Sequence, residues 1–186
     1  LPKKGYHIIA GELPPTPQAA GKGHDRFAFA GADIDQGWAN LADVEILAFH
    51  QWSASRMRIA AIDAAARAVT FTGRTRSDGW WGKFIKGHRY LAINVKEALA
   101  EPGEWYLDRP TGVLTYIPMP GEDPAKAAVI APRLECLVAF VGDGAARRWV
   151  TNVQLRGLTF AHTDWNLPPE GQSFPQAEIG LGSAIV

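Results

Sequence analysis

The stretch NVKEALAEPGEWYLDRPTGVLTYI, Asn94 to Ile117, predicts a short helix followed by a tight β-hairpin. Asn94 can cap the first helical turn and Glu97 can reach back to its start, the reciprocal arrangement of a capping box, so we expect a helix over Val95 to Ala100. The pair Pro102-Gly103 then ends the helix, because proline lacks an amide hydrogen and glycine readily takes the left-handed exit conformation. The chain is therefore expected to turn at this pair.

The hairpin follows directly after this turn. Glu104 to Asp108 and Val113 to Ile117 each alternate in polarity with a period of two residues, which indicates two half-buried strands. The loop Arg109-Pro110-Thr111-Gly112 offers a proline with a preset φ and a glycine free to take a positive φ, as a short hairpin loop requires. We therefore expect Trp105 and Tyr106 to be fixed on a rigid two-stranded unit.

The sequence before the hairpin has the pattern of a mainly antiparallel β unit. Strands are predicted over Tyr6 to Ala10, Val44 to Phe49, Arg56 to Ile62 and Ala68 to Thr72. The last of these lies in the run IDAAARAVTF, where Val69 and Phe71 alternate with polar positions and favour a strand over the helix that the alanines alone would suggest. The rest of Leu1 to Ala30 is rich in Pro and Gly and is predicted as a linker or surface loop.

A long loop is predicted from Gly73 to Tyr90. It mixes aromatic with basic residues, and Asp78 is the one acidic residue in it; the aromatic and basic residues are Trp80, Trp81, Phe84, Tyr90, Arg74, Arg76, Lys83, Lys86 and Arg89. Such a mixture can hold single-stranded nucleic acid by stacking and phosphate contacts, or an acidic polysaccharide by the same physics. It is equally typical of a solvated loop whose aromatic residues plug a core.

From Val129 onward the pattern changes to short apolar runs with a glycine-rich turn at Gly142-Asp143-Gly144. Strands in this part would place alternate side chains inward, as stacked solenoid coils do; the inward set is Val153, Leu155, Leu158 and Phe160. The segment Leu134 to Val186 is long enough for one or two coils, so we expect the chain to end inside its solenoid with an unpaired apolar edge at Val186.

Several of these runs together resemble a known family. The helix and hairpin NVKEALAEPGEWYLDRPTGVLTYIP, the run RIAAID, the run Gly87-His88-Arg89-Tyr90 and the late run NVQLRGLTFAHTDW are similar to right-handed parallel β-helix proteins of the glycoside hydrolase family 141 type, including their insertion domain. The resemblance extends from about Asp25 to the end of the chain. It implies a mostly β fold: a small antiparallel β-sandwich-like insertion domain plus the first coils of a right-handed parallel β-helix. The implied division is residues 1–24 as a linker or start of the β-helix, 25–132 as the inserted domain and 133–186 as incomplete coils.

The function implied by the resemblance is that of a secreted, extracellular or periplasmic glycoside hydrolase acting on plant or microbial polysaccharide. In related proteins the catalytic carboxylates lie on later coils, so this fragment alone is expected to be inactive. Because β-helix scaffolds also host non-enzymatic modules, a non-catalytic carbohydrate-binding or adhesion module and a purely structural insertion domain remain alternatives. The chain begins with Leu1 rather than methionine, and we expect a fragment or processed form of a longer protein.

The composition limits the kinds of partner and cofactor that the chain is expected to bind. Nineteen basic and nineteen acidic residues cancel over the 186 residues, which argues against non-specific nucleic-acid binding by the whole molecule. No run approaches the roughly 18 apolar residues of a membrane span. Cys136 is alone, the five histidines lack zinc spacing, and no Asp/Asn cluster has calcium-ligand spacing, so no metal and no cofactor are expected. Oligomeric state is left open.

The candidate binding residues fall into two groups. The run His162 to Trp165 leaves a predicted strand and enters a proline-rich loop, where Trp165 could stack on a sugar while His162 and Asp164 bond its hydroxyl groups; the alternative is an Asp-mediated turn with a packed tryptophan. Further candidate sugar contacts are Trp80, Trp81 and Glu178. Glycoside hydrolysis needs two carboxyl groups about 5 to 5.5 Å or about 6.5 to 9.5 Å apart. The candidates for such a pair in the solenoid part are Asp164, Glu170 and Glu178.

Overall fold

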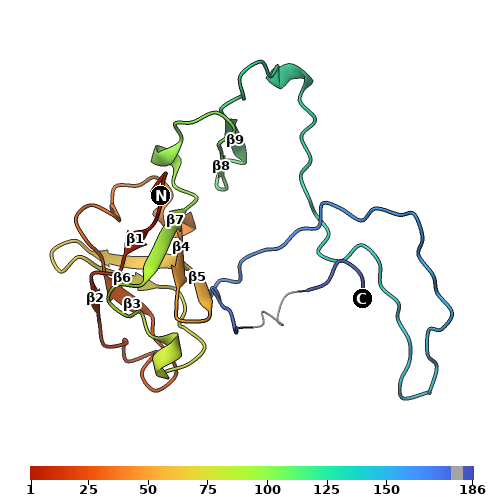
Figure 1. Ribbon diagram of the computed structural model, residues 1–186, viewed down its shortest axis with the longest axis horizontal. Helices are drawn as coiled ribbons and strands as arrows, with labels where there is room; N and C mark the ends of the chain where they lie inside the picture. The colour runs from red at the N-terminus through yellow and green to blue at the C-terminus, as the bar shows by residue number, and fades with distance from the viewer. Residues whose placement is uncertain (177–181) are drawn as a thin grey trace. The chain divides into compact units, whose positions relative to one another are not determined.

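The computed structural model describes residues 1–176 and 182–186 (Figure 1). The chain divides into two compact units: the first comprises Leu1–Ala125 and Leu167–Ile179, and the second comprises Lys126–Asn166 and Gly180–Val186. Regular structure in the described residues is almost entirely β, with helix present only as single 3-10 turns. The prediction of a mostly β, antiparallel fold is therefore confirmed. None of the described helices has the length and apolarity needed to cross a membrane.

The first unit is built on one antiparallel sheet (Figure 1). Its strands are β1 (His7–Ile8), β2 (Gly11–Glu12), β3 (Arg26–Ala28), β4 (Glu45–Phe49), β5 (Ala54–Asp63), β6 (Ala68–Phe71), β7 (Arg89–Ile93) and β10 (Gln172–Ser173). Their order across the sheet is β1-β7-β4-β5-β6-β3-β2, and β10 pairs with β5. The predicted strands that correspond to β4, β5 and β6 are confirmed.

This sheet is rolled so that its two edges meet on one piece of chain. The edge strands β1 and β2 belong to the run His7 to Glu12 and are separated by only two residues. Between them, Ile9 is buried and donates its amide to His88 O over 2.8 Å, and Ala10 donates to Ala28 O over 2.8 Å. Because one run bonds to both β7 and β3, it closes the sheet around its interior.

Aromatic side chains fill that interior. The Phe27 ring lies 5.5 Å from the Phe71 ring, 5.4 Å from that of Phe84 and 5.0 Å from that of Tyr90, all in tilted arrangements that aromatic pairs prefer. All four rings are buried. Phe84 belongs to the predicted loop of Gly73 to Tyr90, so the expectation that aromatic residues of this loop plug the core holds for Phe84 and Tyr90. Trp80 and Trp81 instead lie at the surface.

The predicted hairpin is confirmed. Strands β8 (Trp105–Asp108) and β9 (Val113–Tyr116) pair antiparallel, with Trp105 opposite Tyr116 and Asp108 opposite Val113. Gly112 has a φ of 71°, the left-handed conformation for which glycine is suited. Tyr106 is 2% exposed and supplies the buried face, whereas Trp105 is 64% exposed.

The predicted helix from Val95 to Ala100 is wrong. The structure has only a 3-10 turn at Lys96–Ala98, without a side-chain cap. Asn94 takes a φ of 59°, which prevents it from starting a helix as a cap, and its side chain donates to Asp43 O. The Glu97 carboxylate accepts from the Ala39 amide instead of reaching back along its own turn. Tertiary partners therefore use both side chains of the expected capping box.

The N-terminal segment also differs from the sequence expectation. Only His7–Ile8 of the predicted Tyr6 to Ala10 strand is strand, and β2 and β3 lie in the stretch expected as a linker. Strand β7 begins at Arg89, so it includes the last two residues of the predicted loop. These strands are two to five residues long, too short for a period-2 pattern to stand out. The division into residues 1–24, 25–132 and 133–186 stays a prediction.

The second unit has no named strand among its described residues. Isolated bridges join Val138 to Ile185 in parallel and Asp143 to Arg148 in antiparallel fashion. The expected inward orientation of the apolar side chains is wrong for Val153, Leu155 and Leu158, which are exposed. Apolar side chains become buried only where another layer covers them, and the described part of this unit provides no such layer. Its assignment to β-helix coils stays a prediction.

Candidate ligand-binding surface

Three tryptophans lie together at the surface of the first unit. The Trp52 and Trp80 rings are 5.0 Å apart with an interplanar angle of 71°, and the Trp80 and Trp81 rings are 6.2 Å apart at 81°. Their exposed fractions are 56%, 48% and 50%. We call Trp52, Trp80 and Trp81 the tryptophan surface. Neighbouring exposed aromatic side chains that form one patch often mark an interaction site, so these residues form the strongest candidate binding surface in the unit.

Two separate connections bring the rings together. Trp52 lies in the turn between β4 and β5, which the His50 amide closes by donating to Ser53 O over 2.9 Å. Trp80 and Trp81 open the 3-10 turn Trp80–Gly82, where the Gly82 amide donates to Gly79 O over 3.0 Å. The Trp81 ring lies directly over Gly79, since a Cβ added there would come within 2.9 Å of it. A glycine at position 79 therefore makes room for the ring.

The loop that carries Trp80 and Trp81 closes on itself. Gly82 is buried against the backbone of Ser77, because an added Cβ would lie 2.3 Å from the Ser77 carbonyl oxygen. The Gly79 amide donates to Ser77 Oγ over 2.9 Å, inside the same loop. We call residues 77–82 the closed loop. Its tip presents the two indoles.

Hydrogen bonds outside the closed loop hold its base. The Thr75 amide donates to His24 O over 2.7 Å, the His24 amide donates to Thr75 Oγ1 over 2.8 Å, and Thr75 is buried. The Thr75 hydroxyl in turn donates to Ser77 O over 3.1 Å. His24 Nε2 lies 3.2 Å from Asp78 O and can donate to it. A surface held in this way loses little conformational entropy when it binds a ligand.

A buried histidine supports the surface from below. His50 Nδ1 lies 2.9 Å from Lys83 O and Nε2 lies 2.8 Å from Ser55 Oγ, so the ring donates to Lys83 and accepts from the Ser55 hydroxyl. Ser55 then accepts from Ser173 over 3.1 Å, which ties β10 to the same chain of bonds. Burial lowers the pKa of His50 below its ordinary value, partly offset by the bond to Lys83 O and reinforced by the imidazoles of His88 and His24. The neutral ring is the form that this arrangement favours.

Positive charge surrounds the tryptophan surface along the sequence. Arg74, Arg76 and Lys86 have exposed side chains, and Lys83 is half-buried. None of these four forms an ion pair within the part of the chain that the structure describes. Flat indole faces can stack on a planar or ring-shaped ligand, and unpaired cations near them in the sequence can attract negative charge on that ligand.

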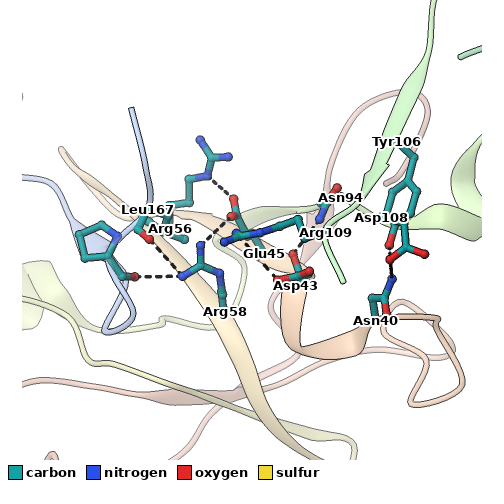
Figure 2. A network of polar contacts seen from close by, with 11 residues as sticks. Asn40, Asp43, Glu45, Arg56, Arg58, Asn94, Tyr106, Asp108, Arg109 and Leu167 are labelled. Carbon is teal, nitrogen blue, oxygen red and sulfur yellow. Dashed lines mark hydrogen bonds and ion pairs between the residues drawn. The ribbon is translucent and has the colours of Figure 1, made fainter. Parts of the chain in front are cut away.

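A second polar network joins the sheet to the hairpin and to the segment after Asn166 (Figure 2). The buried Glu45 carboxylate lies 2.5 Å from Arg56 Nε and 3.8 Å from Arg58 Nη2. Arg58 Nη1 donates to Leu167 O and Pro168 O over 3.1 and 3.2 Å. Because each charge has partners and Arg58 also holds backbone carbonyls, the network reads as a structural connection.

A groove of about 630 Å³ runs between this network and the hairpin. Its lining includes Lys3, Glu104, Trp105 and Arg109. Lys3 hydrogen-bonds Glu104, and together with the amides of Ala100 and Glu101 it lowers the pKa of the Glu104 carboxyl to about 2. Arg109 lies 3.8 Å from the Asp43 carboxylate. The charges in this groove are thus largely neutralised by one another, which makes it a weaker candidate than the tryptophan surface.

The sequence candidates are distributed over both units. Trp80 and Trp81 belong to the first unit, where they meet Trp52, and the run His162 to Trp165 belongs to the second. In the second unit, Asp164 accepts from the Trp165 amide over 2.8 Å and from the Asn166 side chain over 3.1 Å, and its own amide donates to Leu134 O. Asp164 thus bonds to its neighbours in the chain, whereas Trp165 is exposed and not buried as the alternative interpretation expected.

The remaining carboxylate candidates lie in different parts of the chain. Glu170 is exposed in the first unit, Asp164 lies in the second, and Glu178 lies outside the described residues. Within residues 1–176 and 182–186, no three His, Cys, Asp or Glu side chains gather as metal ligands would. Trp52 is the surface residue that sequence reasoning missed. Its position just after a predicted strand, in a turn, was the available signal, but only the fold brings it to Trp80.

Comparison with known proteins gives one informative likeness. No protein-family model and no curated protein matches the chain. A solved structure described as "Glycoside hydrolase" superposes with a TM-score of 0.70 at 20% sequence identity, over 91% of this chain and 29% of that one. At this identity the likeness concerns the fold alone. The chain thus has a fold like that of part of a glycoside hydrolase, and it spans less than a third of that structure's length.

Proposed function

We propose that this chain is part of a secreted carbohydrate-active protein, a glycoside hydrolase of plant or microbial polysaccharide that works in an extracellular or periplasmic setting. The observation that carries the proposal is the tryptophan surface: three exposed indoles, with Trp80 in contact with both Trp52 and Trp81, on a hydrogen-bonded support. The fold likeness to a glycoside hydrolase agrees with it. In this proposal, Trp52, Trp80 and Trp81 bind the polysaccharide.

The physical basis is the shape of sugar rings. A pyranose has a flat face of C–H groups, which an indole ring can cover. Covering it removes apolar surface from water, worth about 25 cal/mol per Å². Because neighbouring rings lie at 71° and 81° to each other, the surface offers faces in different directions. Such a surface suits a chain of sugars that bends across it more than a single sugar unit.

We further propose that the second unit belongs to a right-handed parallel β-helix of the family 141 type. The parallel bridge between Val138 and Ile185 supports this, as does the donation of the Phe140 amide to Val186 O and of the Val186 amide to Val138 O. The exposed apolar side chains of this unit also fit a coil that neighbouring coils would cover. The first unit would then be the domain inserted into that solenoid.

The residues described here are proposed to bind and not to cleave. The Asp164 carboxylate accepts hydrogen bonds from its neighbours Trp165 and Asn166, so it is assigned a local structural role instead of one of the two carboxyl roles in hydrolysis. The catalytic pair is assigned to other parts of the protein. His162 and Trp165 remain candidates for an additional sugar contact in the second unit.

The experiment is affinity electrophoresis of the 186-residue chain in gels that contain a panel of polysaccharides. Trp52→Ala, Trp80→Ala and Trp81→Ala should each reduce retardation, whereas Trp149→Ala, which removes an exposed tryptophan of the second unit, should not. Equal effects of all four substitutions, or no retardation in any gel, would refute the binding surface. Reducing-sugar release by the longest natural protein tests the hydrolase assignment, and retention without turnover would identify a non-catalytic binding module.

A further inference from the structure

We propose that the ligand of the tryptophan surface is an acidic polysaccharide, one that carries carboxylate or sulfate groups, and that Arg76 and Lys83 bind those groups. This inference rests on the proposed function and specifies its substrate class. It concerns the first unit alone. Its basis is the charge around the closed loop and the place of two cations at the base of that loop.

The local charge is strongly asymmetric. Between Gly73 and Tyr90 there are five basic residues and one acidic residue, Asp78, although the 186 residues carry equal numbers of each sign. The rest of the chain is therefore net negative, and positive charge is concentrated in the stretch that contains Trp80 and Trp81. Such a concentration attracts anions to this stretch without making the whole molecule a general polyanion binder.

The acidic residues near the stretch from Gly73 to Tyr90 leave some of its basic side chains available for a ligand. Asp78 is exposed, and it contacts His24 through its backbone carbonyl oxygen. Glu12 lies near His88 and raises its pKa, although burial lowers that pKa by more. Glu170 shares a cavity of about 360 Å³ with Arg74. We assign the ligand contacts to Arg76 and Lys83 because they flank the closed loop and form no ion pair among the described residues, although Lys83 lines a cavity of about 290 Å³ together with Glu12.

The geometry of the closed loop brings the backbones of these two residues close together. Ser77 and Gly82 touch, since a Cβ on Gly82 would come within 2.3 Å of Ser77 O. Arg76 and Lys83 are the residues immediately outside this contact, one on each side of the base of the loop. The indoles of Trp80 and Trp81 occupy its tip. In the proposal, the long cationic side chains of these two residues reach the charged groups of a sugar chain that is stacked at the tip.

Backbone atoms alone hold both residues in the fold. The Arg76 amide donates to Ser173 Oγ over 2.9 Å, and Lys83 uses its amide and carbonyl for bonds to Trp80 and His50. No hydrogen bond involves either side chain among the described residues. A substitution that removes these charges therefore removes no side-chain hydrogen bond or ion pair among the described residues.

Single-stranded nucleic acid is the other polyanion that stacks on aromatic side chains. The neutral charge of the whole chain argues against it, because nucleic-acid affinity depends on many phosphate contacts over a broad basic surface. An oligonucleotide therefore serves as a competing probe in the same experiment.

The test is titration calorimetry of the 186-residue chain with two matched ligand pairs: polygalacturonate against its methyl ester, and chondroitin sulfate against desulfated, carboxyl-reduced chondroitin. Each pair keeps the sugar backbone and removes the charge. We expect tighter binding of at least one acidic member, with affinity that falls as salt rises from about 20 to about 200 mM. A loss of affinity on methyl esterification of polygalacturonate identifies carboxylate as the recognised group, whereas an effect in the chondroitin pair alone identifies a requirement for negative charge.

Two double variants provide the residue-level readout. Arg76→Gln with Lys83→Gln should lower affinity for the acidic ligand about three- to tenfold, the range expected for two exposed charge contacts, and should leave the neutral ligand within about twofold. Lys22→Gln with Arg156→Gln removes the same charge from exposed positions elsewhere and should leave both affinities unchanged.

The outcomes separate this inference from the function on which it rests. Equal affinity for charged and neutral members refutes the acidic ligand but leaves carbohydrate binding standing. Equal losses in the two double variants refute the roles of Arg76 and Lys83. Binding to no polysaccharide refutes both proposals, as does binding to a single-stranded oligonucleotide alone.

Discussion

The side-chain amide of Asn40 donates to the Tyr106 hydroxyl over 2.8 Å, and through its second hydrogen it also donates to Asp108 Oδ1 over 2.7 Å (Figure 2). Asn40 has a φ of 51°, a left-handed conformation that asparagine tolerates better than most residues. One side chain therefore connects the β8–β9 hairpin to the loop before β4.

Asn40→Asp should destabilise the first unit because it places a carboxylate at hydrogen-bond distance from that of Asp108. The free energy of unfolding should fall by about 1–3 kcal/mol at neutral pH, as for loss of a partner to a charged acceptor. Urea titration followed by tryptophan fluorescence measures it. The double variant with Asp108→Asn should recover most of the loss, because an amide again faces a carboxylate. Without such recovery, the Asn40 contact does not determine stability.

His50 predicts a pH dependence. Its pKa is lowered in the folded chain relative to the ordinary 6.5, first by burial. The unfolded chain therefore binds this proton more readily, so stability is fully present above about pH 6.5 and is lost as the pH falls below it.

The matched variant is His50→Gln, whose amide can still donate to Lys83 O and accept from Ser55. Urea midpoints at about pH 7 and about pH 5 should differ less in this variant than in the unsubstituted chain. His7 and His88, whose pKa values burial also lowers, remain in both proteins and cancel in the comparison. Identical pH slopes would show that His50 does not contribute.

Two glycines of the closed loop should behave differently when changed to alanine. Gly82→Ala would bring Cβ within 2.3 Å of the Ser77 carbonyl, a backbone atom that cannot rotate away, so both stability and polysaccharide retardation should fall, stability by about 1–3 kcal/mol. Gly79→Ala would meet only the movable Trp81 ring at 2.9 Å. It should weaken retardation with a stability change within about 0.5 kcal/mol. If both variants bind normally, the position of Trp81 is irrelevant to binding.

Arg58→Met should cost about 1.5–3 kcal/mol, because it removes donors to the Leu167 and Pro168 carbonyls and one of the two cations beside buried Glu45. Arg156→Met, at an exposed position of the second unit, is the control and should change stability by less than about 0.5 kcal/mol. Comparable urea midpoints for the two variants would argue against a structural role for the network in Figure 2.

Features set by neighbouring residues could be predicted from the sequence. The β8–β9 hairpin depends on Pro110, Gly112 and a period of two, all within twelve residues, and it was predicted correctly. The capping box at Asn94 and Glu97 is equally local in appearance. It failed because Asp43 O and the Ala39 amide, more than fifty residues away, bond to those two side chains.

The candidate site shows the same limit. Trp80 and Trp81 could be chosen from sequence because they are adjacent to each other and to basic residues. Trp52 could not, since its place beside Trp80 depends on the register of β4 against β5 and on the anchoring of Phe84 in the core. Likewise, no sequence pattern reveals that Ser77 and Gly82 touch, which is what places Arg76 and Lys83 together.

The way in which the sheet closes has a consequence for how this unit can fail. The run His7 to Glu12 covers the outer amides and carbonyls of β7 and β3 at once, so its detachment would uncover two strand edges in one event. Bare edges of this kind recruit strands from other molecules. A protease cut or truncation that frees these six residues would thus promote intermolecular aggregation of this unit.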